Sequence, residues 1–316
     1  MYDAIMGLPD HLRRAMELPL VHVRPEAYRD IREVVFIGMG GSGIAGNFIR
    51  DLIDTVPITL SKSYTPPRFL DGKTLAICTS YSGNTKETVE AYHAALKKNC
   101  RVLGITSGGK LLELLVEERK PHVQLPAGLL PRVSLPFQLI ALLRFFETLG
   151  MTAVDPGIAD FVEGIRPGID RQAREIAARL GSTIPFIYGT RESVALRFKT
   201  QLNENAKTHA KAEVFPELNH NEVVAWQLPP KGISVILLRE EGEKEEVRAS
   251  IEFLKEHIGD RALVIEAVAH GKTPLERLLS HLLLGDLVSY HLAVAKGVDP
   301  VPVEYINTLK KIIREV

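Results

Sequence analysis

Residues 38–43 read GMGGSG and follow directly on the apolar run 34–37 (VVFI). A second unit of this kind lies downstream, where residues 79–85 (TSYSGNT) follow the apolar run 74–78 (TLAIC). A short apolar run that leads through a glycine-containing turn into a helical pattern is typical of a buried parallel strand followed by a helix. Both loops are therefore expected at the carboxyl ends of strands, where α/β proteins bind their ligands.

Both loops carry groups that can hold a phosphate. Glycines let the backbone approach an anion closely, and the amides in the first turn of a following helix add partial positive charge. Hydroxyl side chains supply further donors. The candidate phosphate-binding residues are Gly41, Ser42, Ser80, Ser82 and Thr85. We therefore expect the two loops to present their donors to one sugar phosphate.

The first loop also matches the dinucleotide-binding pattern G-x-G-x-x-G through Gly38, Gly40 and Gly43. That fingerprint requires an acidic residue at the end of the next strand to hold the ribose. Here the apolar run 58–60 leads into Ser-Lys-Ser at 61–63 instead. The glycines could also be simple turns, but two turns rich in serine and threonine favour a ligand site. The sequence therefore favours sugar-phosphate binding.

The composition indicates a globular protein large enough for two domains. The chain has 316 residues, 45% of them hydrophobic, and single cores usually stop growing below that size. Lys plus Arg and Asp plus Glu both total 39, so no global field attracts nucleic acid or anionic lipid. The two cysteines indicate neither a disulfide framework nor a metal site. We expect a soluble, cytoplasmic protein without a membrane-spanning segment.

The alternation of strand and helix patterns predicts doubly wound parallel sheets. The expected strands are 34–37, 58–60, 74–78, 101–105 and 123–125 in the first half and 184–188, 233–238 and 262–266 in the second. The segment 151–168 carries two Pro-Gly steps that break the alternation, and a helix is expected over 169–180. We place an N-terminal domain with the phosphate-binding loops at 1–152 and a C-terminal domain at 153–316.

Two helices of the first half have clear patterns. Residues 86–98 (KETVEAYHAALKK) are amphipathic, and Asn84 and Glu87 are arranged like a capping box at the helix start. Residues 135–149 (LPFQLIALLRFFETL) are apolar around most of the circumference, which favours a core helix over a subunit contact. The second half restarts the pattern without the glycine cluster. This predicts two related halves and one phosphate site per chain.

Polar and charged residues are densest between residues 201 and 226 (QLNENAKTHAKAEVFPELNHNEVVAW). Glu and Lys at helical spacing favour a solvated charged helix as the default interpretation. Glu204 differs because it lies between two amide side chains, and His220 lies between Asn219 and Asn221. Both are candidates for a catalytic role.

Five motifs together give a more specific indication: GMGGSGIAG, TSYSGNTKET, PRVSLP, the segment from NEN to ELNHNE with its terminal Trp226, and DPVPVEYINTLK. Together they closely resemble the bifunctional phosphoglucose/phosphomannose isomerases of the sugar isomerase (SIS) domain superfamily. The resemblance covers about residues 31–311, whereas the serine-rich loop alone would indicate only the superfamily. It implies two doubly wound SIS domains, each a parallel sheet flanked by helices, and a homodimer. It also implies an enzyme that needs no metal or redox cofactor.

The reaction implied by this resemblance interconverts glucose 6-phosphate or mannose 6-phosphate with fructose 6-phosphate through a cis-enediol. The phosphate would be bound by the hydroxyl residues of the two loops. Glu204 matches the family's position for the base that moves the proton between the first two carbons. Arg132 in PRVSLP is placed to stabilise the enediolate charge. His220, donated by the partner subunit, and Lys310 match the positions for ring opening.

Some choices stay open within this interpretation. Lys310 and Lys311 are adjacent, and Lys310 is preferred on the pattern I-x-x-L-K. Val303 stands where some relatives are expected to carry a threonine near the substrate. The alternative from another class is a non-catalytic sugar-phosphate-binding regulator, which would not need Glu204 and Arg132 together. Aminosugar synthesis would need a catalytic N-terminal nucleophile, whereas Met1 is followed by Tyr2.

Overall fold

The computed structural model describes residues 1–229 and 231–315. The chain divides into two compact units, which we call the N-terminal and the C-terminal unit. Gly7–Glu163 form the N-terminal unit, and Met1–Met6 join the chain from Gly164 onward in the C-terminal unit. The first residues belong there because the Tyr2 hydroxyl donates to Asp170 Oδ2 at 2.9 Å. The domain boundary after residue 152 stays a prediction.

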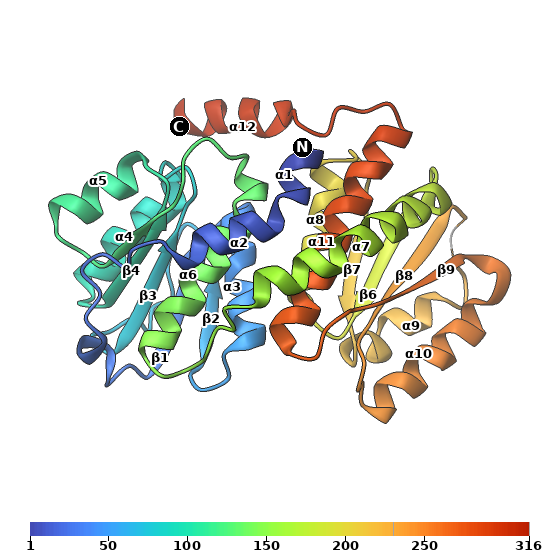
Figure 1. The fold of residues 1–316 in the computed structure, drawn as a ribbon, viewed down its shortest axis with the longest axis horizontal. Helices are drawn as coiled ribbons and strands as arrows, with labels where there is room; N and C mark the ends of the chain where they lie inside the picture. The colour runs from blue at the N-terminus through green and yellow to red at the C-terminus, as the bar shows by residue number, and fades with distance from the viewer. Residues whose placement is uncertain (230, 316) are drawn as a thin grey trace. The chain divides into compact units, whose positions relative to one another are not determined.

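The N-terminal unit is built on a sheet of five parallel strands in the order β2-β1-β3-β4-β5 (Figure 1). The strands are β1 (Glu33–Gly38), β2 (Ile58–Ser61), β3 (Thr74–Thr79), β4 (Arg101–Thr106) and β5 (His122–Gln124). All five strands expected from the sequence are present. Because the strand order reverses between β1 and β3, a crevice for ligands is expected at their carboxyl ends. Both serine-rich loops begin at this edge.

Helices cover the two faces of this sheet. They are α2 (Leu8–Met16), α3 (Gly40–Leu52), α4 (Lys86–Lys97), α5 (Gly109–Glu117) and α6 (Leu135–Thr148), with short 3-10 turns η1 (Pro25–Tyr28) and η2 (Pro131–Val133). Helix α3 packs on β1, where a Cβ on Gly46 would lie 2.4 Å from the Phe36 ring. Helix α6 packs against α2 and α3 and is buried along most of its length, which confirms it as a core helix.

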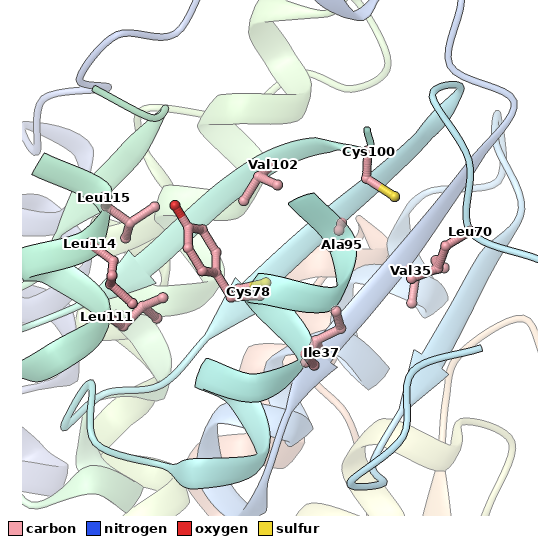
Figure 2. Packing of buried hydrophobic residues seen from close by; sticks show 13 residues of the cluster. Val35, Ile37, Leu70, Cys78, Ala95, Cys100, Val102, Leu111, Leu114 and Leu115 are labelled. Atoms are coloured by element: carbon pink, nitrogen blue, oxygen red, sulfur yellow. The ribbon is translucent and has the colours of Figure 1, made fainter. Parts of the chain in front are cut away.

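Figure 2 shows the core on the other face, where α4 and α5 pack on β3 and β4. Val35 and Ile37 of β1 point into this cluster, which also contains both cysteines. Cys78 and Cys100 are buried free thiols, and burial raises the pKa of Cys100 to about 11. Buried thiols with raised pKa values are unreactive, so both cysteines serve packing.

The C-terminal unit contains a sheet of four parallel strands in the order β7-β6-β8-β9 (Figure 1). The strands are β6 (Ile184–Gly189), β7 (Lys211–Val214), β8 (Ile233–Arg239) and β9 (Leu263–Val268). The order repeats that of β2-β1-β3-β4, which confirms two related α/β halves. The helices and turns are α1 (Tyr2–Met6), α8 (Glu192–Glu204), η3 (Glu217–His220), α9 (Glu222–Ala225), α10 (Glu245–Ile258), η4 (Gly259–Arg261), α11 (Pro274–Ala295) and α12 (Glu304–Glu315).

Helix α11 is the central helix of the C-terminal unit. By length and composition it could cross a membrane, contrary to the expectation that the chain has no such segment. However, 78% of its most apolar window is buried inside the fold, where α11 packs against α8 and α1. Its apolar surface is therefore explained by core packing. A Thr273 to Glu276 capping box starts the helix.

Three local expectations were wrong. The helix expected over 169–180 is longer, because α7 (Ile158–Leu180) continues through Pro167. The polar stretch 201–226 is not one charged helix, since it contains the edge strand β7, which pairs with β6. The expected capping box at α4 is absent, because Thr85 is the N-cap and Asn84 Oδ1 accepts from Lys110 N at 3.0 Å.

His281 in α11 makes the stability of the protein dependent on pH. Its Nε2 donates to Ala267 O at 3.1 Å, while Nδ1 has no partner among the described residues. Burial lowers the pKa of His281, although the Ala267 carbonyl and the charges of Glu240 and Glu243 oppose this shift. The unfolded chain therefore binds a proton below about pH 6.5 that the folded protein does not.

Above that pH, His281 does not lower the free energy of unfolding. Below it, we expect His281 to lower the free energy of unfolding by up to about 1.4 kcal/mol per pH unit. Urea unfolding at pH 7.5 and 5.5 checks this. His281→Gln, which keeps a donor for Ala267, should lose less stability between the two pH values than the unaltered protein. Equal losses in both proteins would show that His281 does not contribute.

Candidate active site

The structure brings the two serine-rich loops into contact in the N-terminal unit. Ser42 lies in the first turns of α3 and is buried. Its Oγ accepts a hydrogen bond from the backbone N–H of Tyr81, in the second loop, at 3.1 Å. Because β1 and β3 are adjacent parallel strands, their following loops meet at one edge of the sheet. The contact expected from the sequence is therefore present.

The second loop folds into a compact set of hydroxyl groups. Ser80 Oγ lies 2.9 Å from Thr85 Oγ1 and accepts from Gly83 N at 3.1 Å. Ser82 is exposed, and its Oγ accepts from Asn84 N at 3.3 Å. Thr85 is the N-cap of α4, so the hydroxyls lie at the positive end of a helix. Such a turn can donate several hydrogen bonds to an anion.

Two glycines make this loop geometry possible. Gly83 has a φ of 68°, and a Cβ there would lie 1.7 Å from the carbonyl oxygen of Gly108. Gly41 lies against η2, where a Cβ would lie 3.3 Å from Pro131 O and 3.6 Å from Arg132 Cα. The first loop is therefore packed directly on the PRV turn. All five phosphate candidates and Arg132 gather at one edge of the N-terminal sheet.

Two cations belong to this region of an otherwise neutral chain. The Arg132 side chain is only 3% exposed, although it carries a full positive charge. Lys62 follows β2 at the same edge of the sheet and was not predicted as a site residue. Its Cε would lie 3.5 Å from a Cβ on Gly43, and its Nζ donates to Asn47 Oδ1 at 2.7 Å. The signal available in the sequence was the position of Lys62 just after the predicted strand 58–60, which ends at the same edge of the sheet.

Glu204, the candidate base, lies in the C-terminal unit as the last residue of α8. It lines a cavity of about 790 Å³ and is partly buried there. The other lining residues come from α8, the following loop and the C-terminal segment: Lys199, Asn203, Lys207, Thr208, His209, Ala210, Pro302, Val303, Glu304, Tyr305 and Ile306. Val303, singled out in the sequence, therefore lies in the same cavity as Glu204.

The structure does not bring the two ring-opening candidates into this cavity. His220 is the last residue of η3 and is exposed. Lys310 lies on α12 and is exposed as well. Neither residue is among the described residues that line the cavity with Glu204. The side chain of Lys311 lies outside the described residues.

The loop that carries His220 is fixed by a buried polar network. Glu222, two residues further on, accepts from the Tyr188 hydroxyl at 2.7 Å and forms an ion pair with Lys211. Trp226 Nε1 donates to the same Tyr188 hydroxyl at 3.2 Å. Burial, with the Glu222 charge, raises the pKa of Tyr188, so its hydroxyl stays a donor. Glu222 of the ELNHNE motif and the following Trp226 therefore hold the loop on the sheet.

At the carboxyl ends of the C-terminal strands, a carboxylate of the protein pairs with the arginines that lie there. Glu240 follows β8, and its carboxylate accepts from Arg191 Nε at 2.8 Å and from Arg277 Nε at 3.2 Å. Arg191 is the N-cap residue of α8. An internal carboxylate thus lies near the start of α8, at a strand edge equivalent to that of the serine-rich loops. This arrangement supports the prediction of one phosphate site per chain.

A metal site has no evident basis in the described side chains. Among residues 1–229 and 231–315, no three His, Cys, Asp or Glu residues are grouped so that they could hold a metal ion.

Comparison with solved structures finds the same fold in other proteins. The C-terminal domain of a glucosamine-fructose-6-phosphate aminotransferase from Francisella tularensis has a TM-score of 0.76 at 18% identity, covering 95% of this chain and 97% of that chain. Tagatose-6-phosphate ketose/aldose isomerase from Escherichia coli has a TM-score of 0.73 at 14% identity, covering 94% of this chain and 93% of that chain. At these identities the likeness establishes the fold alone.

Sequence comparison is more specific. Residues 169–313 match the family described as bacterial phospho-glucose isomerase C-terminal SIS domain. A bifunctional phosphoglucose/phosphomannose isomerase from Caldicellulosiruptor bescii is 34% identical, covering 100% of this chain and 99% of that protein. A D-glucosamine-6-phosphate 4-epimerase from Sulfolobus acidocaldarius is 34% identical over 60% of this chain and 63% of that protein. With this conservation across its whole length, the chain belongs to the bifunctional phosphoglucose/phosphomannose isomerase family.

Proposed function

We propose that this protein is an aldose-ketose isomerase that interconverts glucose 6-phosphate or mannose 6-phosphate with fructose 6-phosphate. The observation that carries the proposal is the contact between the two serine-rich loops, at the switch point of the N-terminal sheet, in a member of this family. The dianionic phosphate is bound by Ser42, Ser80, Ser82, Thr85 and the Gly41 backbone. Lys62 and the helix starts add positive charge.

Glu204 is the base in this proposal. It removes the proton from the second carbon of the open-chain aldose and returns it to the first carbon of the cis-enediol. Arg132 stabilises the negative charge that develops on the enediolate oxygen. His220 and Lys310 move the proton between the anomeric hydroxyl and the ring oxygen when the ring opens. Rotation about the bond between the second and third carbons lets either face be protonated, so both aldoses react.

We further propose that the enzyme works as a homodimer in the cytoplasm, in glycolysis and gluconeogenesis. His220 is exposed and is not among the residues that line the Glu204 cavity, which supports its donation to the partner subunit. A non-catalytic regulator remains the alternative of another class. It would bind the same sugar phosphates but would not turn them over.

A coupled assay on glucose 6-phosphate and mannose 6-phosphate, with and without EDTA, tests the proposal. We expect turnover of both substrates, and activity that survives the chelator because the proposed steps need no metal. D-glucosamine 6-phosphate belongs in the same assay, because one relative is named as its 4-epimerase. Binding of the hexose phosphates without turnover would favour the regulator.

Replacing Ser82 with alanine tests the phosphate loop. The side chain is exposed, so the fold should be unaffected, but one hydrogen bond to the phosphate is lost. A hydrogen bond to a charged group contributes about 1.5–3 kcal/mol, so the Kd for fructose 6-phosphate should rise by at least about tenfold. Isothermal titration calorimetry measures this change, with the exposed Ser182→Ala as control. An unchanged Kd would remove Ser82 from the site.

A further inference from the structure

Lys207 has a backbone conformation that lysine rarely adopts. It lies three residues after Glu204, in the loop between α8 and β7, and its φ is 50°. This left-handed region is usually filled by glycine or asparagine, because other side chains collide with their own backbone there. A lysine at such a position directs attention to the contacts that its side chain makes.

The Lys207 ammonium group joins two segments that line the Glu204 cavity. Its Nζ donates to the carbonyl oxygen of Glu204 at 2.5 Å and to that of Pro302 at 2.8 Å. The first contact places a positive charge at the C-terminal end of α8, where the helix dipole is negative. The second reaches the segment that leads into α12. Both carbonyl groups therefore share one cation.

The loop around Lys207 is held firmly from other directions. Thr208 N donates to Leu202 O at 3.1 Å, and Asn203 Nδ2 donates to Thr208 O at 2.8 Å. Lys296, just after α11, donates to Thr208 Oγ1 at 2.7 Å. The backbone at Lys207 is thus held against α8 and the end of α11. From this fixed backbone, the ammonium group holds the Glu204 carbonyl and the Pro302 carbonyl in place.

We propose that Lys207 is a positioning residue for Glu204. By holding the peptide carbonyl of Glu204 and the Pro302 carbonyl together, it fixes the carboxylate relative to the C-terminal wall of the cavity. The inference rests on the proposed function, because it takes Glu204 as the base. A displacement of about 1 Å in a reacting group can lower the rate by about a hundredfold.

The variant Lys207→Asn separates positioning from folding. Asparagine accepts the left-handed backbone, so the thermal midpoint should stay near that of the unaltered protein. The kcat for fructose 6-phosphate should fall by about 10- to 100-fold, while the KM changes by less than about threefold. Lys207→Arg keeps a cationic donor and should recover most of the lost kcat. Arg119→Asn is the matched control, because Arg119 has a φ of 49° in the N-terminal unit.

An unchanged kcat in Lys207→Asn, or a loss of kcat that matches a loss of folded protein, would overturn the inference. Failure of Lys207→Arg to restore kcat would also count against it. Amide hydrogen exchange provides a readout that does not need the reaction. If the link exists, Lys207→Asn should speed exchange in residues 297–309, and unchanged exchange would contradict it. An unaltered protein without isomerase activity would instead refute the proposed function, while the exchange experiment would still decide the link.

Discussion

Replacing Glu204 with glutamine is expected to lower kcat for both aldose 6-phosphates by about a thousandfold, because general bases typically contribute 10²- to 10⁴-fold. Glutamine keeps the size and the hydrogen-bonding oxygen of the side chain but cannot accept a proton. The Kd for fructose 6-phosphate should change little, since the proposed phosphate site lies in the serine-rich loops and does not include Glu204. Steady-state kinetics and calorimetry on the same preparation measure both quantities.

The matched control for this variant is Glu256→Gln, on the exposed side of α10. It makes the same chemical change away from the cavity that Glu204 lines, and it should keep full activity. If Glu204→Gln turns over either aldose at a rate close to that of the unaltered protein, another residue is the base. A large loss of binding together with the loss of kcat would mean that Glu204 holds the substrate.

The largest effect on stability is expected for Asp286→Asn in α11. Asp286 accepts two hydrogen bonds from Arg197 of α8, at 2.9 Å to Nε and at 2.7 Å to an Nη atom. The side chains are only 8% and 2% exposed, so the variant removes a buried carboxylate charge that faces the buried guanidinium. Breaking such a pair costs about 3–5 kcal/mol. The free energy of unfolding of the C-terminal unit should fall by that amount.

Urea unfolding followed by tryptophan fluorescence measures this loss. Trp226 is the single tryptophan of the chain and is buried in the C-terminal unit, so its signal reports on that unit. Glu256→Gln removes an exposed carboxylate from α10 in the same unit, and it should change stability by less than about 1 kcal/mol. An Asp286→Asn protein as stable as this control would show that the buried pair is dispensable.

The sequence predicted the strands well because their cause is local. The strands expected over residues 34–37, 74–78 and 233–238 are mostly apolar runs of strand length, as is typical of parallel strands that are buried on both faces. Strand β7 was missed because Lys211–Val214 is only four residues long and lies in a stretch of polar and charged residues. Its identity as a strand depends on pairing with β6, which lies more than twenty residues earlier in the chain.

The helix ends show the same limit. Pro167 disrupts a helix locally, yet α7 continues through it. The Asn84 side chain fits a capping box by spacing, but its oxygen accepts from the backbone N–H of Lys110, at the start of α5, which no local pattern relates to it. Contacts between distant segments decide both positions, so a local reading of the sequence could not predict them.

The candidate site divides in a similar way. Serine and glycine at strand ends predicted the phosphate loops, because glycine permits a tight turn and serine supplies hydroxyl donors. Lys62 offered only its position after a strand, and Lys207 carried no comparable signal. Lys62 comes next to the first serine-rich loop only when β2 pairs with β1. Lys207 reaches the wall of the Glu204 cavity only when its backbone is left-handed and its ammonium group contacts the Pro302 carbonyl. Tertiary structure alone gives these two lysines their importance.

Incubation of the protein with fructose 6-phosphate in D₂O, followed by proton NMR, tests the central claim most directly. Proton transfer by Glu204 through a cis-enediol predicts that glucose 6-phosphate and mannose 6-phosphate both appear. Because the protonated carboxyl can exchange with solvent before it returns its proton, deuterium should accumulate at the second carbon over many turnovers. If no aldose 6-phosphate forms, or if the aldoses still carry no deuterium at that carbon after many turnovers, the account of this protein as a proton-transferring isomerase is contradicted.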